Sequence, residues 1–203
     1  GALHARLPEA MTIDFDDLSA LREVAKSADV IVIGPGLGLE RLDLLTEKQK
    51  LVIDGSALTL FAREHLDLPF PENTVFTPHE MELERLSGLK IGQQTKEEVQ
   101  DFVNQLGAIV VAKSSETRIF APNRESFILK IGSPAQATGG MGDTLAGMVG
   151  GFLAQFHGET EEVVAAATYL HSLIASVLAQ KTYVVLPSRL IEEIPLFMKK
   201  YEC

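Results

Sequence analysis

Hydrophobic and polar positions follow two different periods along the first half of this chain. Stretches with helical spacing are expected to form helices at residues 14–28, 40–50, 58–65, 79–88 and 95–107. Short β-branched runs between them are expected to form strands at residues 30–34, 51–54 and 74–78. Short apolar strands that alternate with helices predict an α/β fold, in which helices pack against a mostly parallel sheet.

The pattern changes after residue 107, where strand-like runs follow one another at residues 108–114, 117–122 and 126–131. The last two are expected to pair antiparallel, because the connection between them is too short for a crossover. The remaining third is predicted to be helical, at residues 142–156, 160–180 and 188–201. Thr95 and Ser188 are expected to cap helices, and Gly88 and Gly107 to end them.

Composition and charge narrow the class of protein. The chain has 203 residues, 46% of them hydrophobic, which suits one globular domain covering residues 1–203. A formal net charge of −10 gives no electrostatic footprint for nucleic acid or an anionic membrane. The single cysteine, Cys203, cannot form a disulfide within one chain. We expect no apolar run to approach the roughly 18 uncharged residues of a spanning helix, and therefore expect a cytoplasmic protein.

A glycine-rich segment, "GPGLG", follows the first predicted strand and places Gly34, Gly36 and Gly38 in a turn. Asp54 follows at the end of the next strand, as in a dinucleotide-binding unit. The G-x-G-x-x-G fingerprint fails, however, because Leu39 stands where it requires glycine. Two interpretations stay open, a loop that lets a ligand approach the backbone and a tight strand-to-helix connection.

A second glycine-rich segment, "TGGMGD", precedes a helix that is expected to begin at Thr144. A helix amino terminus carries partial positive charge and unpaired N–H groups, so glycines on its approach favour phosphate binding. Asp143 is either the N-cap of this helix or a general base beside the phosphate. Three nearby glycines are more than a cap requires, which favours the catalytic interpretation.

Two further side chains are candidates because they follow predicted strands. His79, in "TPHEMELERL", is either a ligand contact or part of an exposed helix start; a metal site is not expected there, since no second histidine lies near in sequence. Lys113, in "AKSSETRIF", is either a surface lysine or a point charge on a phosphate.

Taken in order, the segments "VIVIGPGLG", "LVIDGSALTL", "VFTPHEMELERLSG", "VVAKSSETRIF" and "GSPAQATGGMGDTLAGMVGGFLAQ" resemble the ADP- or ATP-dependent NAD(P)H-hydrate dehydratases of the ribokinase-like superfamily. The resemblance implies a three-layer α/β/α fold with antiparallel edge strands and C-terminal helices. It also implies repair of hydrated NADH and NADPH: the hydrate hydroxyl is phosphorylated and then leaves as phosphate.

The resemblance assigns site residues by matching motifs. Asp143 would be the catalytic residue and would contact substrate together with Gly36 and His79. The nucleotide would be bound by the residues Lys113, Ser114, Ser115, Glu116, Thr117, Gly139, Gly140 and Gly142. Two departures from the family pattern concern the same regions: Ser114 replaces a common glycine, and "DGSAL" keeps Asp54 but not a second aspartate.

Cofactors and partners follow from the same resemblance. ADP or ATP would be the co-substrate, with Mg²⁺, and the protein would be a homo-oligomer, a tetramer being one such assembly. Family members carry early strands before the equivalent of "LPEAM", so this chain is expected to lack the family's N-terminal segment. The alternatives are a vitamin-precursor kinase of the same superfamily and a nucleotide-binding module without catalysis.

Overall fold

The computed structural model describes residues 7–36, 49–64, 68 and 70–201. Its centre is a six-stranded sheet whose strands lie in the order β1-β2-β3-β4-β5-β6. The strands are β1 (Val30–Ile33), β2 (Lys50–Ile53), β3 (Thr74–Phe76), β4 (Ile109–Ala112), β5 (Arg118–Phe120) and β6 (Phe127–Ile128). The first four are parallel, and β5 and β6 are antiparallel to their neighbours. The predicted α/β class and the antiparallel pairing are confirmed.

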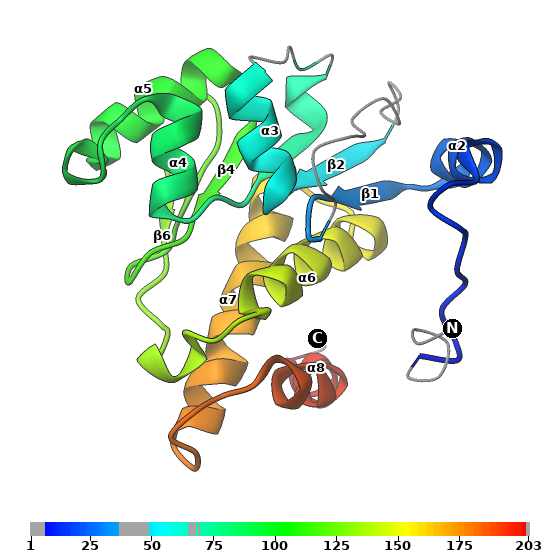
Figure 1. Ribbon diagram of the computed structural model, residues 1–203. Helices are drawn as coiled ribbons and strands as arrows, with labels where there is room; N and C mark the ends of the chain where they lie inside the picture. Colours follow the sequence, from blue (N-terminus) through cyan, green and yellow to red (C-terminus); the bar gives the residue numbers. More distant parts are fainter. Residues whose placement is uncertain (1–6, 37–48, 65–67, 69, 202–203) are drawn as a thin grey trace.

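Helices cover both faces of this sheet (Figure 1). One face carries α3 (Ser56–Glu64), α4 (Glu80–Ser87) and α5 (Lys96–Leu106), and the other carries α6 (Met141–Gln155) and α7 (Thr160–Ala179). Beyond α6 and α7 lies α8 (Pro187–Tyr201), and α2 (Leu18–Ser27) lies near the amino end of β1, away from the covering helices. Short 3₁₀ turns lie at Pro71–Asn73, Ile91–Gln93 and Pro134–Gln136.

The core divides according to the alternation of side chains along each strand. On β2, Leu51 and Ile53 pack in the cluster beneath α3, α4 and α5, whereas Val52 packs in the cluster beneath α6 and α7. On β4, Val110 and Val111 divide in the same way. Burial on both faces explains why these strands appear in the sequence as continuous apolar runs.

Several helix ends lie where the sequence predicts them. The side chain of Thr95 accepts a hydrogen bond from the Glu98 amide and caps α5. Gly107 ends α5 and Gly88 ends α4, both in the left-handed conformation that glycine adopts without strain. The predicted helix at 40–50 lies outside the described residues as far as residue 48, as does Gly38, and its last residue, Lys50, instead begins β2.

Two predictions about the C-terminal helices are wrong. The sequence places the start of α6 at Thr144, but the helix begins at Met141 with Gly140 as its N-cap, which rules out the capping alternative for Asp143. Ser188 does not cap α8, because the helix already begins at Pro187, a residue type that suits the first helical turn. In both cases a glycine or a proline marks the start of the helix, and the helix begins before the polar residue that the sequence suggested.

Helix α7 corrects the expectation that no apolar run approaches the length of a membrane span. Its 20 residues pass that test by length and composition. Half of the most apolar window is buried inside the molecule, where α7 packs against α6 and α8. The run is therefore explained by its place in the core.

Candidate functional site

The carboxyl ends of the four parallel strands meet at one edge of the sheet. Gly34, Asp54, Thr77 and Lys113 each follow a different strand there. Backbone hydrogen bonds continue the alignment past the strands: the Asp54 amide donates to the Ile33 carbonyl at 3.0 Å. Open α/β sheets bind ligands at this edge, and side chains distant in sequence converge on it.

Asp54 is the buried acid of this edge. Its side chain is 3% exposed, and Oδ1 accepts hydrogen bonds from the Lys113 ammonium at 2.8 Å and from the Thr77 hydroxyl at 2.7 Å. A buried carboxylate needs such compensation, because desolvation of an unpaired charge is costly. Lys113 is therefore not a surface lysine, since its ammonium group pairs with the buried Asp54 carboxylate.

The amino end of α6 approaches the same ammonium group. A Cβ placed on Gly142 would lie 3.2 Å from Lys113 Nζ and 3.9 Å from Asp54 Oδ2. Gly142 thus allows the lysine to lie directly beside the first turn of α6. The unpaired N–H groups and partial positive charge of this helix end add to the lysine charge, which favours an anion at this point.

A cleft of about 930 Å³ opens beside these groups, and we call it the main cleft. Four segments line it: the 113–117 loop, the 129–138 segment, the first turns of α6 and the middle of α7. His79, Gly142 and all five residues of the predicted nucleotide loop lie on its wall. The structure thereby brings together seven of the residues that the sequence singled out.

His79 joins this wall in a constrained position. Its Nδ1 accepts hydrogen bonds from the Met81 and Glu82 amides at 3.2 and 3.4 Å, while Glu82 accepts from the His79 amide at 2.9 Å. This reciprocal capping box begins α4. Since Nδ1 is an acceptor, Nε2 carries the ring proton, and about half of the side chain is exposed to the cleft side.

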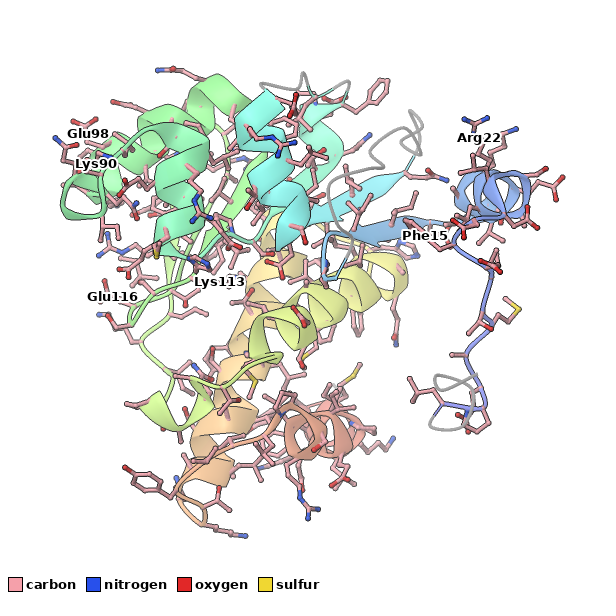
Figure 2. All side chains as sticks on the ribbon, viewed as in Figure 1. Phe15, Arg22, Lys90, Glu98, Lys113 and Glu116 are labelled. Carbon is pink, nitrogen blue, oxygen red and sulfur yellow. The ribbon has the colours of Figure 1, made fainter. Side chains whose placement is uncertain are left out.

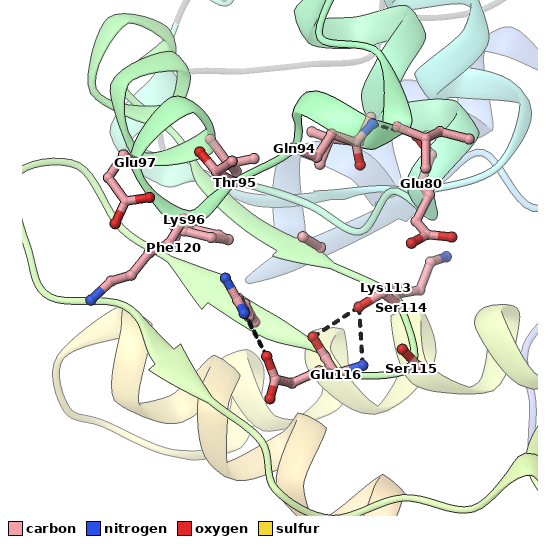
Figure 3. Close-up of a pocket in the computed structure, with 15 residues that line it drawn as sticks. Glu80, Gln94, Thr95, Lys96, Glu97, Lys113, Ser114, Ser115, Glu116 and Phe120 are labelled. Carbon is pink, nitrogen blue, oxygen red and sulfur yellow. Dashed lines mark hydrogen bonds and ion pairs between the residues drawn. The ribbon is translucent and has the colours of Figure 1, made fainter.

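The loop after Lys113 is closed by a hydroxyl. Ser114 Oγ donates to the Glu116 carbonyl at 2.8 Å and accepts from the Glu116 amide at 3.1 Å (Figure 3). This gives a local role to the serine that replaces the family's common glycine. The opposite side of the loop borders a polar hollow of about 500 Å³ between α4 and α5. In Figure 2, Lys113 lies near the middle of the molecule and Glu116 lies at its left edge.

Four predicted site residues lie outside the wall of the main cleft. Asp143 is exposed on the first turn of α6 and lines a separate, mostly apolar hollow of about 510 Å³ against α8, which we call the α8 hollow. Gly139 and Gly140 precede α6, and Gly36 lies in the turn after β1 with open space around it. Gly142 and Asp143 therefore face two different cavities from adjacent positions.

The sequence predictions did not include the one buried histidine on the described wall of the main cleft. His171, on α7, is 5% exposed and lines the cleft. The pKa of His171 is lowered to about 4, mainly by burial and also by the nearby Lys113 charge, against the opposing effect of a hydrogen bond to the Met141 backbone. The only sequence signal was a histidine within an otherwise apolar helix.

Metal ligation by side chains alone is not indicated. In the part of the chain that the structure describes, no group of three or more His, Cys, Asp or Glu side chains could hold a metal ion. The polar groups of this edge include the Lys113 ammonium group and the amides of a helix end, which suit phosphate.

Comparisons with known proteins agree with this geometry. The family model described as NAD(P)H-hydrate dehydratase matches residues 1–196. The chain belongs to the NAD(P)H-hydrate dehydratase family. The protein named ADP-dependent (S)-NAD(P)H-hydrate dehydratase from Lactococcus lactis subsp. lactis (strain IL1403) is 93% identical over the whole of this chain, which spans 76% of that relative.

Two solved structures relate this dehydratase-family chain to known folds. A ribokinase-like superfamily protein from Enterococcus faecalis V583 superimposes with a TM-score of 0.95 at 48% identity, covering 99% of this chain and 73% of that one. The Bacillus subtilis ADP/ATP-dependent NAD(P)H-hydrate dehydratase, co-crystallized with ATP/Mg²⁺, superimposes with a TM-score of 0.81 at 25% identity, covering 99% and 75%. The predicted family and ribokinase-like fold are confirmed.

Proposed function

We propose that this chain carries the nucleotide-dependent dehydration of NAD(P)H hydrate, with ADP or ATP as co-substrate. The observation that carries the proposal is the juxtaposition of Lys113 with Gly142, whose hypothetical Cβ would lie 3.2 Å from the ammonium nitrogen. A lysine held at a helix amino end is a phosphate site, and the name of the 93% identical relative supplies the reaction.

In the proposed reaction the terminal phosphoryl group of ADP passes to the ring hydroxyl of the hydrate. The hydroxyl loses its proton to Asp143, the new C–O–P linkage forms, and AMP is released. Cleavage of the C–O bond then expels inorganic phosphate, and loss of a proton from the adjacent ring carbon restores the double bond. Hydrate and ADP therefore give NAD(P)H, AMP and phosphate.

The nucleotide and the hydrate would meet at the amino end of α6. The main cleft would hold the nucleotide, with its phosphates at Lys113 and the α6 amino end, and with the 113–117 loop and the Gly139–Gly142 approach around them. The hydrate hydroxyl would lie between the terminal phosphate and Asp143, with Gly36 and His79 as further substrate contacts. Direct transfer would then occur at the first turn of α6, where Gly142 and Asp143 are neighbours.

Mg²⁺ fits this site in company with the nucleotide. Mg²⁺ in nucleotide sites is held by one or two carboxylates, by phosphates and by water. Asp54 Oδ2 accepts no hydrogen bond within the described residues, whereas Oδ1 accepts two. Asp54 is therefore the carboxylate that would hold the ion, which would neutralise phosphate charge. We also propose that the protein is cytoplasmic and forms a homo-oligomer.

The experiment follows products rather than binding. Purified chain is mixed with NADH hydrate and ADP or ATP, with Mg²⁺ or with a chelator, and both reduced-nicotinamide absorbance and inorganic phosphate are measured. Equal recovery of absorbance and phosphate is expected. A stable phosphoester without recovered absorbance would identify a small-molecule kinase instead, and nucleotide binding without any product would identify a binding module.

A further inference from the structure

The apolar helix α7 carries a polar face where it meets the main cleft. His171 and Ser172 follow Thr168 by three and four positions, so both lie on the same side of the helix as Thr168. They are 1%, 5% and 5% exposed, and all three line the cleft. Thr168 Oγ1 donates to the Val164 carbonyl at 2.7 Å, so its hydroxyl proton is already used within the helix.

His171 presents an unused acceptor on this face. Its Nε2 is buried and has no hydrogen-bond partner among the described residues. The ring donates a hydrogen bond to the Met141 backbone, which raises the pKa, and because Nε2 has no partner among the described residues this bond is assigned to Nδ1. With the pKa lowered to about 4, the ring is neutral at pH 7, with the proton on Nδ1. The remaining nitrogen, Nε2, is then an acceptor.

Gln136 presents a second unused acceptor. It ends the 3₁₀ turn Pro134–Gln136, lines the same cleft, and its Oε1 is buried without a partner among the described residues. A buried acceptor without a donor destabilises the ligand-free protein, and such atoms are rare in folded proteins. Two of them on the wall of one cleft indicate that a ligand supplies the donors.

We propose that His171 and Gln136 form a subsite for hydrogen-bond donors on the nucleoside part of the nucleotide. This inference rests on the proposed function, which assigns the phosphates to Lys113 and the amino end of α6. Ribose hydroxyls and the exocyclic amine of adenine are the donors that a nucleoside offers. Both acceptor atoms are shielded from solvent in the ligand-free protein, so the proposal requires that the two side chains shift toward the ligand on binding.

The test compares ligands and variants in one calorimetric series. ADP, 2′-deoxy-ADP and inosine diphosphate are titrated into wild type, His171→Asn and Gln136→Met. Asparagine keeps a donor for the Met141 backbone but has no equivalent of Nε2, and methionine preserves the shape of glutamine without an acceptor. Ser176→Ala is the matched control, because Ser176 Oγ is also buried and unpartnered on α7 but does not line the cleft.

We expect wild type to bind one of the two analogues roughly threefold to tenfold more weakly than ADP, which is the scale of one net hydrogen bond. Weaker binding of 2′-deoxy-ADP assigns the donor to the ribose, and weaker binding of inosine diphosphate assigns it to the exocyclic amine. His171→Asn or Gln136→Met should weaken ADP binding by a similar factor and abolish the discrimination. Ser176→Ala should behave as wild type.

The inference is overturned if both variants bind ADP as tightly as wild type, or if they keep the full discrimination between ADP and its analogues. Equal affinity of wild type for all three nucleotides would also overturn it. If His171→Asn does not fold, the result for Gln136→Met alone decides the test, because Gln136 lies in a short 3₁₀ turn. Failure of wild type to bind ADP at all would instead reject the proposed function.

Discussion

The turn after β1 and the approach to α6 are both rich in glycine, yet their glycines meet different constraints. A Cβ on Gly34, where φ is +125°, would lie 1.6 Å from the Asp54 carbonyl oxygen. A Cβ on Gly142 would instead lie 3.2 Å from the end of the Lys113 side chain. Gly36 and Gly139 have open space at that position.

The difference shows that a glycine motif is not one feature. Gly34 is needed by the backbone, because β1 and the turn after β2 touch there and backbone atoms cannot move aside. Gly142 is needed beside a charged side chain, where a methyl group would displace the ammonium and leave the fold largely intact. The first is a constraint of folding and the second is a constraint of the site.

The largest effect is expected for Gly34→Ala. The added methyl group collides with backbone, and the positive φ adds strain, so we expect a loss of about 4 kcal/mol or more in the free energy of unfolding. Urea unfolding measures it. Gly139→Ala, in open space, is the matched control and should change stability by less than about 0.5 kcal/mol. Equal midpoints for the two variants would show that the turn relaxes.

The next effect concerns catalysis rather than folding. Asp143→Asn should reduce turnover roughly a hundredfold, since a general base is lost. Stability should change little, because Asp143 is exposed and is not the helix cap. Single-turnover phosphate release measures the effect. Glu162→Gln, which removes a similar exposed acid from the first turn of α7, serves as the control. Normal turnover in Asp143→Asn would remove Asp143 from the mechanism.

Gly142→Ala should act on nucleotide binding. Displacement of the Lys113 ammonium should weaken ADP binding by about 1–3 kcal/mol, the scale of a charged hydrogen bond left unmade. Calorimetry of ADP binding and thermal unfolding are measured together. Gly151→Ala, on the same helix in open space, should leave the affinity unchanged. Reduced thermal stability with unchanged affinity would place Gly142 with Gly34, as a packing glycine.

The smallest overall effect is expected for Gly36→Ala. Its φ of +70° costs an alanine about 1 kcal/mol, with no collision to add. Gly88→Ala has nearly the same φ of +79° in open space, far along the chain at the end of α4, and should lose the same stability. Only Gly36→Ala should raise KM for the hydrate, measured in steady state. Identical KM values in both variants would exclude Gly36 from the substrate site.

The sequence by itself determined the elements whose signals are local. The β-branched runs of β1 to β4, the Thr95 cap and the glycine stops at positions 88 and 107 depend on neighbours within a few residues, and all lie where they were predicted. The order of the motifs was enough to identify the family. The α6 start was misjudged because Gly140 adopts a positive φ that no polar cap signals.

Only the tertiary structure decided which side chains meet. Asp54 and Lys113 are 59 positions apart, and their contact exists because parallel strands align their carboxyl ends at one edge. In sequence, His171 was indistinguishable from a core residue, and nothing indicated that the neighbours Gly142 and Asp143 line different cavities. Such contacts depend on how the sheet orients its helices, and hydrophobic period carries no information about that orientation.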